Sequence, residues 1–109
     1  MNYLGDIRLA LLFYSDERRA QYNQRYSKTG IGEYGQGDRF LGVAMPQIRY
    51  LGKLYEDISH TMLAALITSP FHEERILALV ILVHQYRQCE DDAQTVVDFY
   101  TTYIDHINN

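Results

Sequence analysis

The chain has 109 residues, of which 47% are hydrophobic and 22% charged, and its formal net charge is −4. This length allows one domain or part of a larger one, and the apolar content suffices for a packed core, which excludes a disordered segment. The longest apolar stretch, Ile76 to Val83, is far shorter than the roughly 20 residues of a membrane span. Asp6 and Arg8 stand where a signal peptide needs its apolar core, and a single cysteine, Cys89, allows no internal disulfide. We therefore expect a cytoplasmic protein without membrane contact.

The first part of the chain predicts two helices and a long loop. One apolar helix face is indicated by residues that recur every three or four positions: Leu4, Ile7, Leu11 and Tyr14. Ser15 is placed to cap a second, more polar helix that runs to about Ser27, with Asp16 and Glu17 in its first turn. Residues 28–45 hold glycines at 30, 32, 35, 37 and 42 and predict a loop.

The rest of the chain predicts four further helices. Pro46 suits the first position of a helix whose apolar stripe consists of Ile48, Leu51, Leu54, Tyr55 and Ile58. Ser59 can cap the next helix, which buries Met62, Leu63, Leu66 and Ile67 and ends at Ser69-Pro70. A longer helix spans about Phe71 to Gln88, and its middle is apolar all round. Ala93, Val96, Val97, Tyr100, Ile104 and Ile107 define a last amphipathic helix.

No strand alternation or hairpin turn interrupts this pattern, so residues 1–109 are expected to form a single all-α domain. Successive helices that each offer an apolar face are typical of antiparallel pairs stacked as in helical solenoids.

The charges are unevenly distributed along the chain. Residues 18–53 carry a net charge of +5, from Arg18, Arg19, Arg25, Lys28, Arg39, Arg49 and Lys53 against Glu33 and Asp38. Residues 54–109 carry a net charge of −7, with Arg75 and Arg87 as the only cations. A positive stretch within an acidic chain is a candidate phosphate-facing surface, and its alternative is a solvated helix face plus a loop.

Two chemical motifs fail on their context. Gly30 to Gly35 matches G-x-G-x-x-G, but a dinucleotide-binding loop follows a buried strand, whereas this one follows a charged helical segment. The four histidines, His60, His72, His84 and His106, lie twelve or more residues apart in the sequence and predict no zinc site. We expect neither a cofactor nor a metal.

The glycine-rich stretch from Tyr26 to Val43 resembles the signature of the DNA alkylation repair family, the AlkD-like glycosylases, in its version K-T-G-x-G-E-Y-G-x-G-D-x-F-L-G-V. Three further segments fit the same family: P-x-x-R at Pro46 and Arg49, S-x-x-H-E-x-R at Ser69, His72, Glu73 and Arg75, and the final helix with Asp98-Phe99-Tyr100 and Ile107-Asn108-Asn109. The resemblance covers nearly the whole chain.

This resemblance implies a right-handed superhelix of HEAT-like helix pairs whose basic concave face holds duplex DNA. It also implies cleavage of the N-glycosidic bond of alkylated purines, with a carboxylate stabilising the charge that develops on the sugar. In the family pattern the catalytic groups belong to a W-D-x-V-D motif that follows the asparagines at the end of this sequence. The sequence contains no tryptophan. We therefore expect an N-terminal portion of the fold, without a catalytic residue of its own.

Two function classes follow. The first is a DNA-repair fold that binds duplex DNA weakly, with these candidate contacts: Arg25, Tyr26, Lys28, Arg39, Arg49 and Lys53. Tyr26 matches a cleft tyrosine of the family, whereas Ala44 departs from it, since relatives often carry a polar or basic residue there. The second class is a helical-repeat module for protein interaction, including self-association through an apolar end of the superhelix.

Overall fold

The computed structural model describes residues 4–26, 39–88 and 93–103, and within them it contains six helices and no strand. The helices are α1 (Leu4–Phe13), α2 (Glu17–Tyr26), α3 (Met45–Leu54), α4 (His60–Ile67), α5 (His72–Gln88) and α6 (Ala93–Tyr103). The all-α prediction is confirmed, and most helix bounds that can be compared agree with the sequence pattern to within about one residue. The exception is the end of α3, which lies at Leu54, four residues before Ile58, the last residue of the expected stripe.

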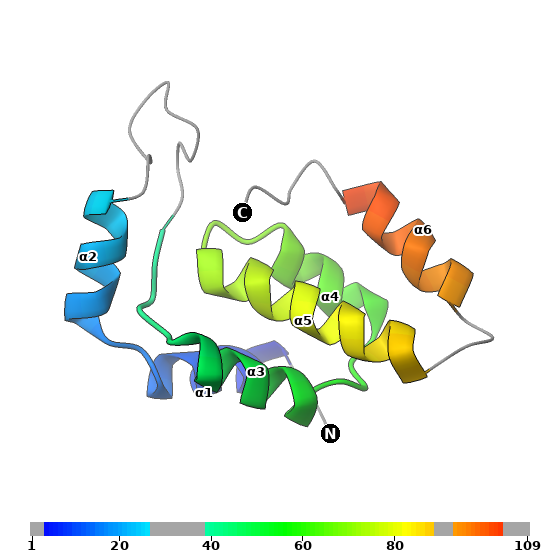
Figure 1. Cartoon of the computed structure of the whole chain (residues 1–109), viewed down its shortest axis with the longest axis horizontal. Coiled ribbons are helices and arrows are strands. Elements are labelled where there is room, and N and C mark those ends of the chain that lie inside the picture. Colours follow the sequence, from blue (N-terminus) through cyan, green and yellow to red (C-terminus); the bar gives the residue numbers. More distant parts are fainter. Residues whose placement is uncertain (1–3, 27–38, 89–92, 104–109) are drawn as a thin grey trace.

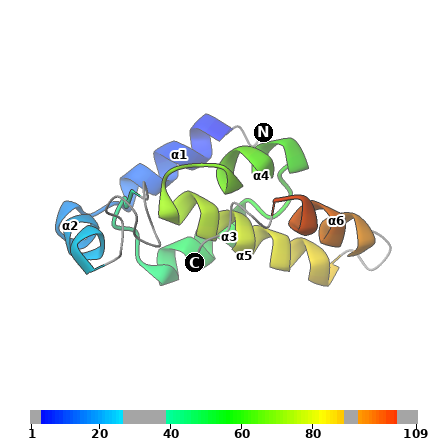
Figure 2. The ribbon, with the colours of Figure 1, turned by 90° about the horizontal axis from the view of Figure 1, so that it is seen from above.

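The helices form two layers. α3 and α5 lie in front in Figure 1, with α1 and α4 behind them, and Figure 2 shows the two layers from above. Helices α1, α4 and α6 run in one direction and α3 and α5 in the other, so neighbours such as α4 and α5 are antiparallel (Figure 1). This arrangement fits stacked helix pairs. The right-handed HEAT-like superhelix stays a prediction.

Helix α5 occupies the centre of the core. It packs against α3, α4 and α6, and it buries Leu77, Ala78, Ile81 and Leu82. A helix that is surrounded by other helices needs apolar residues on several sides, which explains why no single apolar stripe could be assigned to this stretch.

The apolar faces of the outer helices follow their sequence spacing in most places. Ile7 and Leu11 of α1 are fully buried, and so are Leu63, Leu66 and Ile67 of α4. The stripe expected for α3 is wrong at Leu54, which is 54% exposed. Leu54 follows Tyr50 by four residues, so the two share an outer flank of α3, away from the buried Ile48.

The two predicted N-caps differ in outcome. The Ser59 hydroxyl accepts a hydrogen bond from the Met62 backbone N–H, as expected for the cap of α4. The cap of α2 is Asp16 and not Ser15, because the Asp16 carboxylate accepts from the Arg19 N–H at 3.1 Å. The Ser15 hydroxyl instead donates to the Leu12 carbonyl at the end of α1. A carboxylate suits the positive N-terminus of a helix, which favours Asp16.

A buried carboxylate ties the segment before α3 to the start of α5. Glu73 is 2% exposed and accepts hydrogen bonds from the backbone N–H groups of Leu41, Gly42 and Val43 at 2.9, 2.8 and 3.2 Å. Hydrogen bonds to a charged acceptor are strong and offset the cost of its burial. Glu73 therefore fixes the path of the chain as it enters α3.

Gly42 belongs to the same junction. Its φ is +81°, in the left-handed region that favours glycine, and a Cβ there would lie 2.0 Å from the Asp16 carbonyl oxygen. The Leu41 carbonyl accepts from the Asp16 N–H at 3.2 Å, so residues 41–42 run directly against the start of α2. Glycine is required here for space as well as for conformation.

Gly52 sets the distance between α3 and α5. A Cβ at this position would meet the Val80 Cγ1 atom at 2.4 Å, closer than real side-chain carbons come. Glycine lowers the helix propensity of α3, yet it lets the two helices approach at this point. The contact fixes the width of the surface between them.

We predict that Glu73→Gln lowers the free energy of unfolding by about 2–4 kcal/mol, since a neutral amide accepts three N–H donors less well than a carboxylate does. Urea unfolding followed by circular dichroism measures the change. Glu17→Gln is the matched control, because Glu17 is exposed on α2. Equal stability of the two variants would contradict the role given to Glu73.

We also predict that Gly52→Ala destabilises the fold by about 1–3 kcal/mol through overpacking, despite the higher helix propensity of alanine. Val80→Ala removes the atom that clashes, so the double variant should be more stable than the sum of the two single changes implies. The same urea titrations provide this double-mutant cycle. A stabilising Gly52→Ala in the wild-type background would show that α3 and α5 do not meet there.

Candidate nucleic-acid interface

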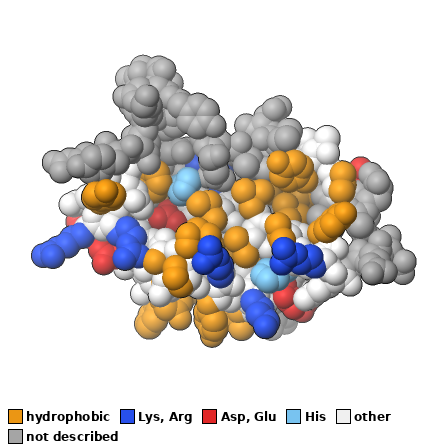
Figure 3. Space-filling view, viewed as in Figure 1, with side chains coloured by type: hydrophobic (Ala, Val, Ile, Leu, Met, Phe, Trp, Pro, Cys, Tyr) orange, Lys and Arg blue, Asp and Glu red, His pale blue; other side chains and the backbone are white. Residues whose placement is uncertain are grey.

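A groove with basic walls lies between α3 and α5. It is lined by Arg49 and Lys53 of α3 and by Val80, Val83, His84 and Arg87 of α5, and its volume is about 340 Å³. We call it the basic groove. Figure 3 shows that basic and hydrophobic side chains alternate over this face of the molecule.

Helical spacing brings these side chains together. Arg49 and Lys53 are four residues apart and stand one turn above each other on the exposed side of α3. On α5, Val80, His84 and Arg87 follow at spacings of four and three along the side that packs on α3. The close approach at Gly52 holds the two rows against each other.

The groove is positive overall. Arg49, Lys53 and Arg87 are basic side chains that are all exposed. The carboxylate of Glu56 lies beside the groove, where its Oε2 atom is 4.0 Å from Nδ1 of His84. Three basic side chains around one groove can bind an anionic polymer such as a phosphate backbone.

The structure brings together two of the six candidate contact residues. Arg49 and Lys53 share the basic groove, whereas Arg39 lies at the opposite end of α5. Its backbone N–H donates to Pro70, and its carbonyl accepts from His72 at the start of α5. Fifteen residues of helix, about 22 Å, therefore separate Arg39 from Arg87.

The other three candidates cannot be placed. Arg25 and Tyr26 belong to the last turn of α2, but their side chains lie outside the described part of the chain. Lys28 and the rest of residues 27–38, including the G-x-G-x-x-G match, also lie outside it.

The sequence reading missed His84 and Arg87. Both lie in the acidic second half of the chain, where the charge pattern predicts no contact with phosphate. Their spacing from Val80 shows that the three share a side of α5, but only the packing of α5 on α3 shows that this side faces Arg49 and Lys53. The remaining cation of that half, Arg75, is 4% exposed and donates to the Ser69 carbonyl at 2.8 Å, so it serves the fold.

The described residues contain neither a candidate metal cluster nor a helix able to span a membrane. No three histidine, cysteine, aspartate or glutamate side chains among them gather closely enough to hold a metal ion. None of the described helices combines the length and the apolar character needed to cross a membrane.

Comparison with known proteins identifies the family. No curated protein and no solved structure matches the chain. The family model described as DNA alkylation repair enzyme matches residues 7–109. This range contains all the helices that build the basic groove, and it spans nearly the whole sequence. The protein therefore belongs to the DNA alkylation repair enzyme family.

Proposed function

We propose that the protein acts in DNA alkylation repair and that it binds the backbone of duplex DNA in the basic groove. The observation that carries the proposal is the convergence of Arg49, Lys53 and Arg87 from two helices on one open groove. Membership of a DNA alkylation repair family indicates DNA as the ligand. The basic groove places cations at the surface where the DNA phosphates would lie.

The distribution of acidic residues supports this proposal. The acidic second half of the chain would repel DNA if all its carboxylates were on the same face. However, Glu73 and Glu74 are buried, where Glu73 binds backbone N–H groups and Glu74 pairs with Arg8 at 3.1 Å. Both carboxylates have partners inside the fold, so neither is an exposed carboxylate that a phosphate backbone would meet.

The proposed surface extends beyond the groove. Arg39 lies at its far end beside the start of α5. The basic stretch of the sequence adds Arg25 and Lys28, and the family resemblance adds Tyr26. Four or five phosphate contacts of this kind give weak binding without sequence preference, with dissociation constants of roughly 10⁻⁴–10⁻⁶ M at physiological salt. A cytoplasmic protein with a single cysteine fits this role.

For the chemical step we propose that this chain needs groups that it does not itself contain. Stabilising positive charge on a sugar requires a carboxylate held in position against it. In the family resemblance that carboxylate belongs to W-D-x-V-D, and the 109 residues include no tryptophan. The basic groove would then contribute DNA binding, and cleavage of the N-glycosidic bond would depend on the W-D-x-V-D motif.

We predict that Arg49→Glu combined with Lys53→Glu weakens binding to a short duplex about tenfold or more at low salt. The plot of log binding constant against log salt concentration should become shallower by about 2 in slope, because two phosphate contacts are lost. Fluorescence anisotropy across a salt series measures both quantities. Arg18→Glu with Arg19→Glu on α2 changes the net charge equally and should have a smaller, readily screened effect. If the two double variants bind alike, the groove is not the contact.

We further predict that the purified 109-residue protein releases no N7-methylguanine from alkylated duplex DNA above the spontaneous rate. The physical reason is the lack of a carboxylate held against the sugar. Chromatography of the released bases measures this, and a family member that contains W-D-x-V-D serves as positive control. Release by the 109-residue protein would place the catalytic group among its own residues.

A further inference from the structure

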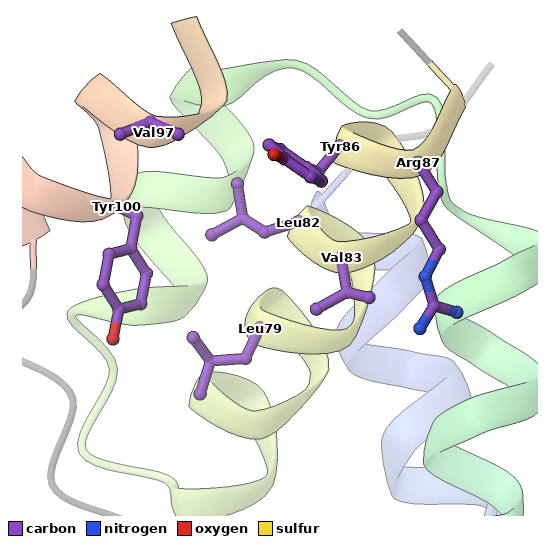
Figure 4. Close-up of a pocket in the computed structure, with 7 residues that line it drawn as sticks. All are labelled: Leu79, Leu82, Val83, Tyr86, Arg87, Val97 and Tyr100. Atoms are coloured by element: carbon purple, nitrogen blue, oxygen red, sulfur yellow. The ribbon is translucent and has the colours of Figure 1, made fainter. Parts of the chain in front are cut away.

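A second groove, formed by α5 and α6, is almost wholly apolar. It is lined by Leu79, Leu82, Val83, Tyr86, Arg87, Val97 and Tyr100, and its volume is about 600 Å³. Figure 4 shows Val97 and Tyr100 of α6 opposite Leu79, Leu82 and Tyr86 of α5. Val83, Tyr86, Val97 and Tyr100 are between 41% and 52% exposed. We call this surface the apolar groove.

The shape of the apolar groove suits a helix. Leu79, Leu82, Val83 and Tyr86 form a ridge along one side of α5, and Val97 and Tyr100 stand one turn apart on α6. Side chains of a third helix can fit into the furrow between two such ridges. Elsewhere in this fold α5 itself packs on α3 and α4 together.

Helix α1 carries an apolar face that the fold leaves exposed. Leu9, Leu12 and Phe13 are 66%, 55% and 81% exposed, on the side of α1 opposite Ile7 and Leu11, which are fully buried. The fold therefore does not explain why α1 is apolar on both sides. We call the exposed side the outer face of α1.

The charges of the two surfaces are complementary. Asp6 precedes Leu9 by three residues and Phe13 by seven, so an exposed carboxylate lies along the outer face of α1. Arg87 lies at the edge of the apolar groove, on the side of α3 (Figure 4). An aspartate beside an apolar helix face fits an arginine beside an apolar groove.

From these observations we infer that two copies of this chain associate head to tail, with the outer face of α1 of one copy seated in the apolar groove of the next. Helices α1 and α6 belong to opposite ends of the stack (Figure 1). The contact is therefore heterologous, and each added copy offers a further outer face and a further groove. This inference does not depend on DNA binding.

The contact is small. Three large side chains enter the groove, far fewer than the roughly 20–30 residues on each side of a standard interface. Association should therefore be weak, with a dissociation constant on the order of 10–1000 μM, and reversible on dilution.

Sedimentation equilibrium of the 109-residue protein tests the inference directly. The average mass should rise above the 12.8 kDa of one chain as the concentration increases from about 10 μM to about 1 mM. Leu9→Glu with Phe13→Glu removes the outer face, and Tyr86→Glu with Val97→Glu removes the apolar groove. All four residues are exposed, so these changes spare the core.

Mixing the two double variants separates a head-to-tail contact from a symmetric one. Each variant alone should stay monomeric, with association at least tenfold weaker than in the wild type. Their equimolar mixture should form a 1:1 dimer that grows no further, because one intact face meets one intact groove. Leu54→Glu changes a leucine on α3 that is 54% exposed and should associate as the wild type does.

Three results would overturn the inference. The first is a wild-type chain that stays monomeric up to about 1 mM, beyond the weakest affinity expected here. The second is association that either double variant leaves unchanged. The third is a mixture of the two variants that remains monomeric while the wild type associates, since this shows that the outer face and the groove do not bind each other.

Discussion

The carboxylate of Glu73 connects three parts of the fold that are distant in sequence. It binds the N–H groups of residues 41–43, the same segment contacts the start of α2 through Leu41, and α3 follows directly after it. Since α3 and α5 provide the two walls of the basic groove, the relative position of Arg49 and Arg87 depends on this buried interaction. Hydrogen bonds to a charged acceptor have strict geometry, which suits an anchor better than apolar packing alone.

Placing charge inside the fold also shapes the field outside it. Glu73, Glu74 and Arg75 are consecutive and buried, and each has a hydrogen-bonding partner: backbone N–H groups, Arg8 and the Ser69 carbonyl, respectively. Burial of such groups is tolerable only with partners of this kind. As a consequence, the net charge counted along the sequence differs from the charge of the surface, because it includes buried carboxylates that a ligand does not contact. The basic groove is positive in a chain whose formal charge is −4.

Much of the fold could be predicted from the sequence, because helix spacing and caps are local properties. Ile7 and Leu11, the Ser59 cap and the long helix to Gln88 follow from spacing and residue type alone. The basic groove could be predicted only in part. Arg49 and Lys53 stand out by charge, but Arg87 joins them only through the packing of α5 on α3 at Gly52. That contact links residues 28 positions apart, and no periodicity within one helix reveals it.

Helix α5 also explains why the basic and apolar grooves adjoin. Different sides of α5 face α3, α4 and α6. Val83 and Arg87 lie between the side that faces α3 and the side that faces α6, so these two residues line both grooves. A phosphate backbone in one groove and a helix in the other would therefore share the Arg87 guanidinium. If both proposed ligands bind, the effect of each on the affinity of the other must be equal, because coupling between two sites is reciprocal. A guanidinium paired with Asp6 of a second copy is less available to phosphate, so the shared arginine favours negative coupling between association and DNA binding.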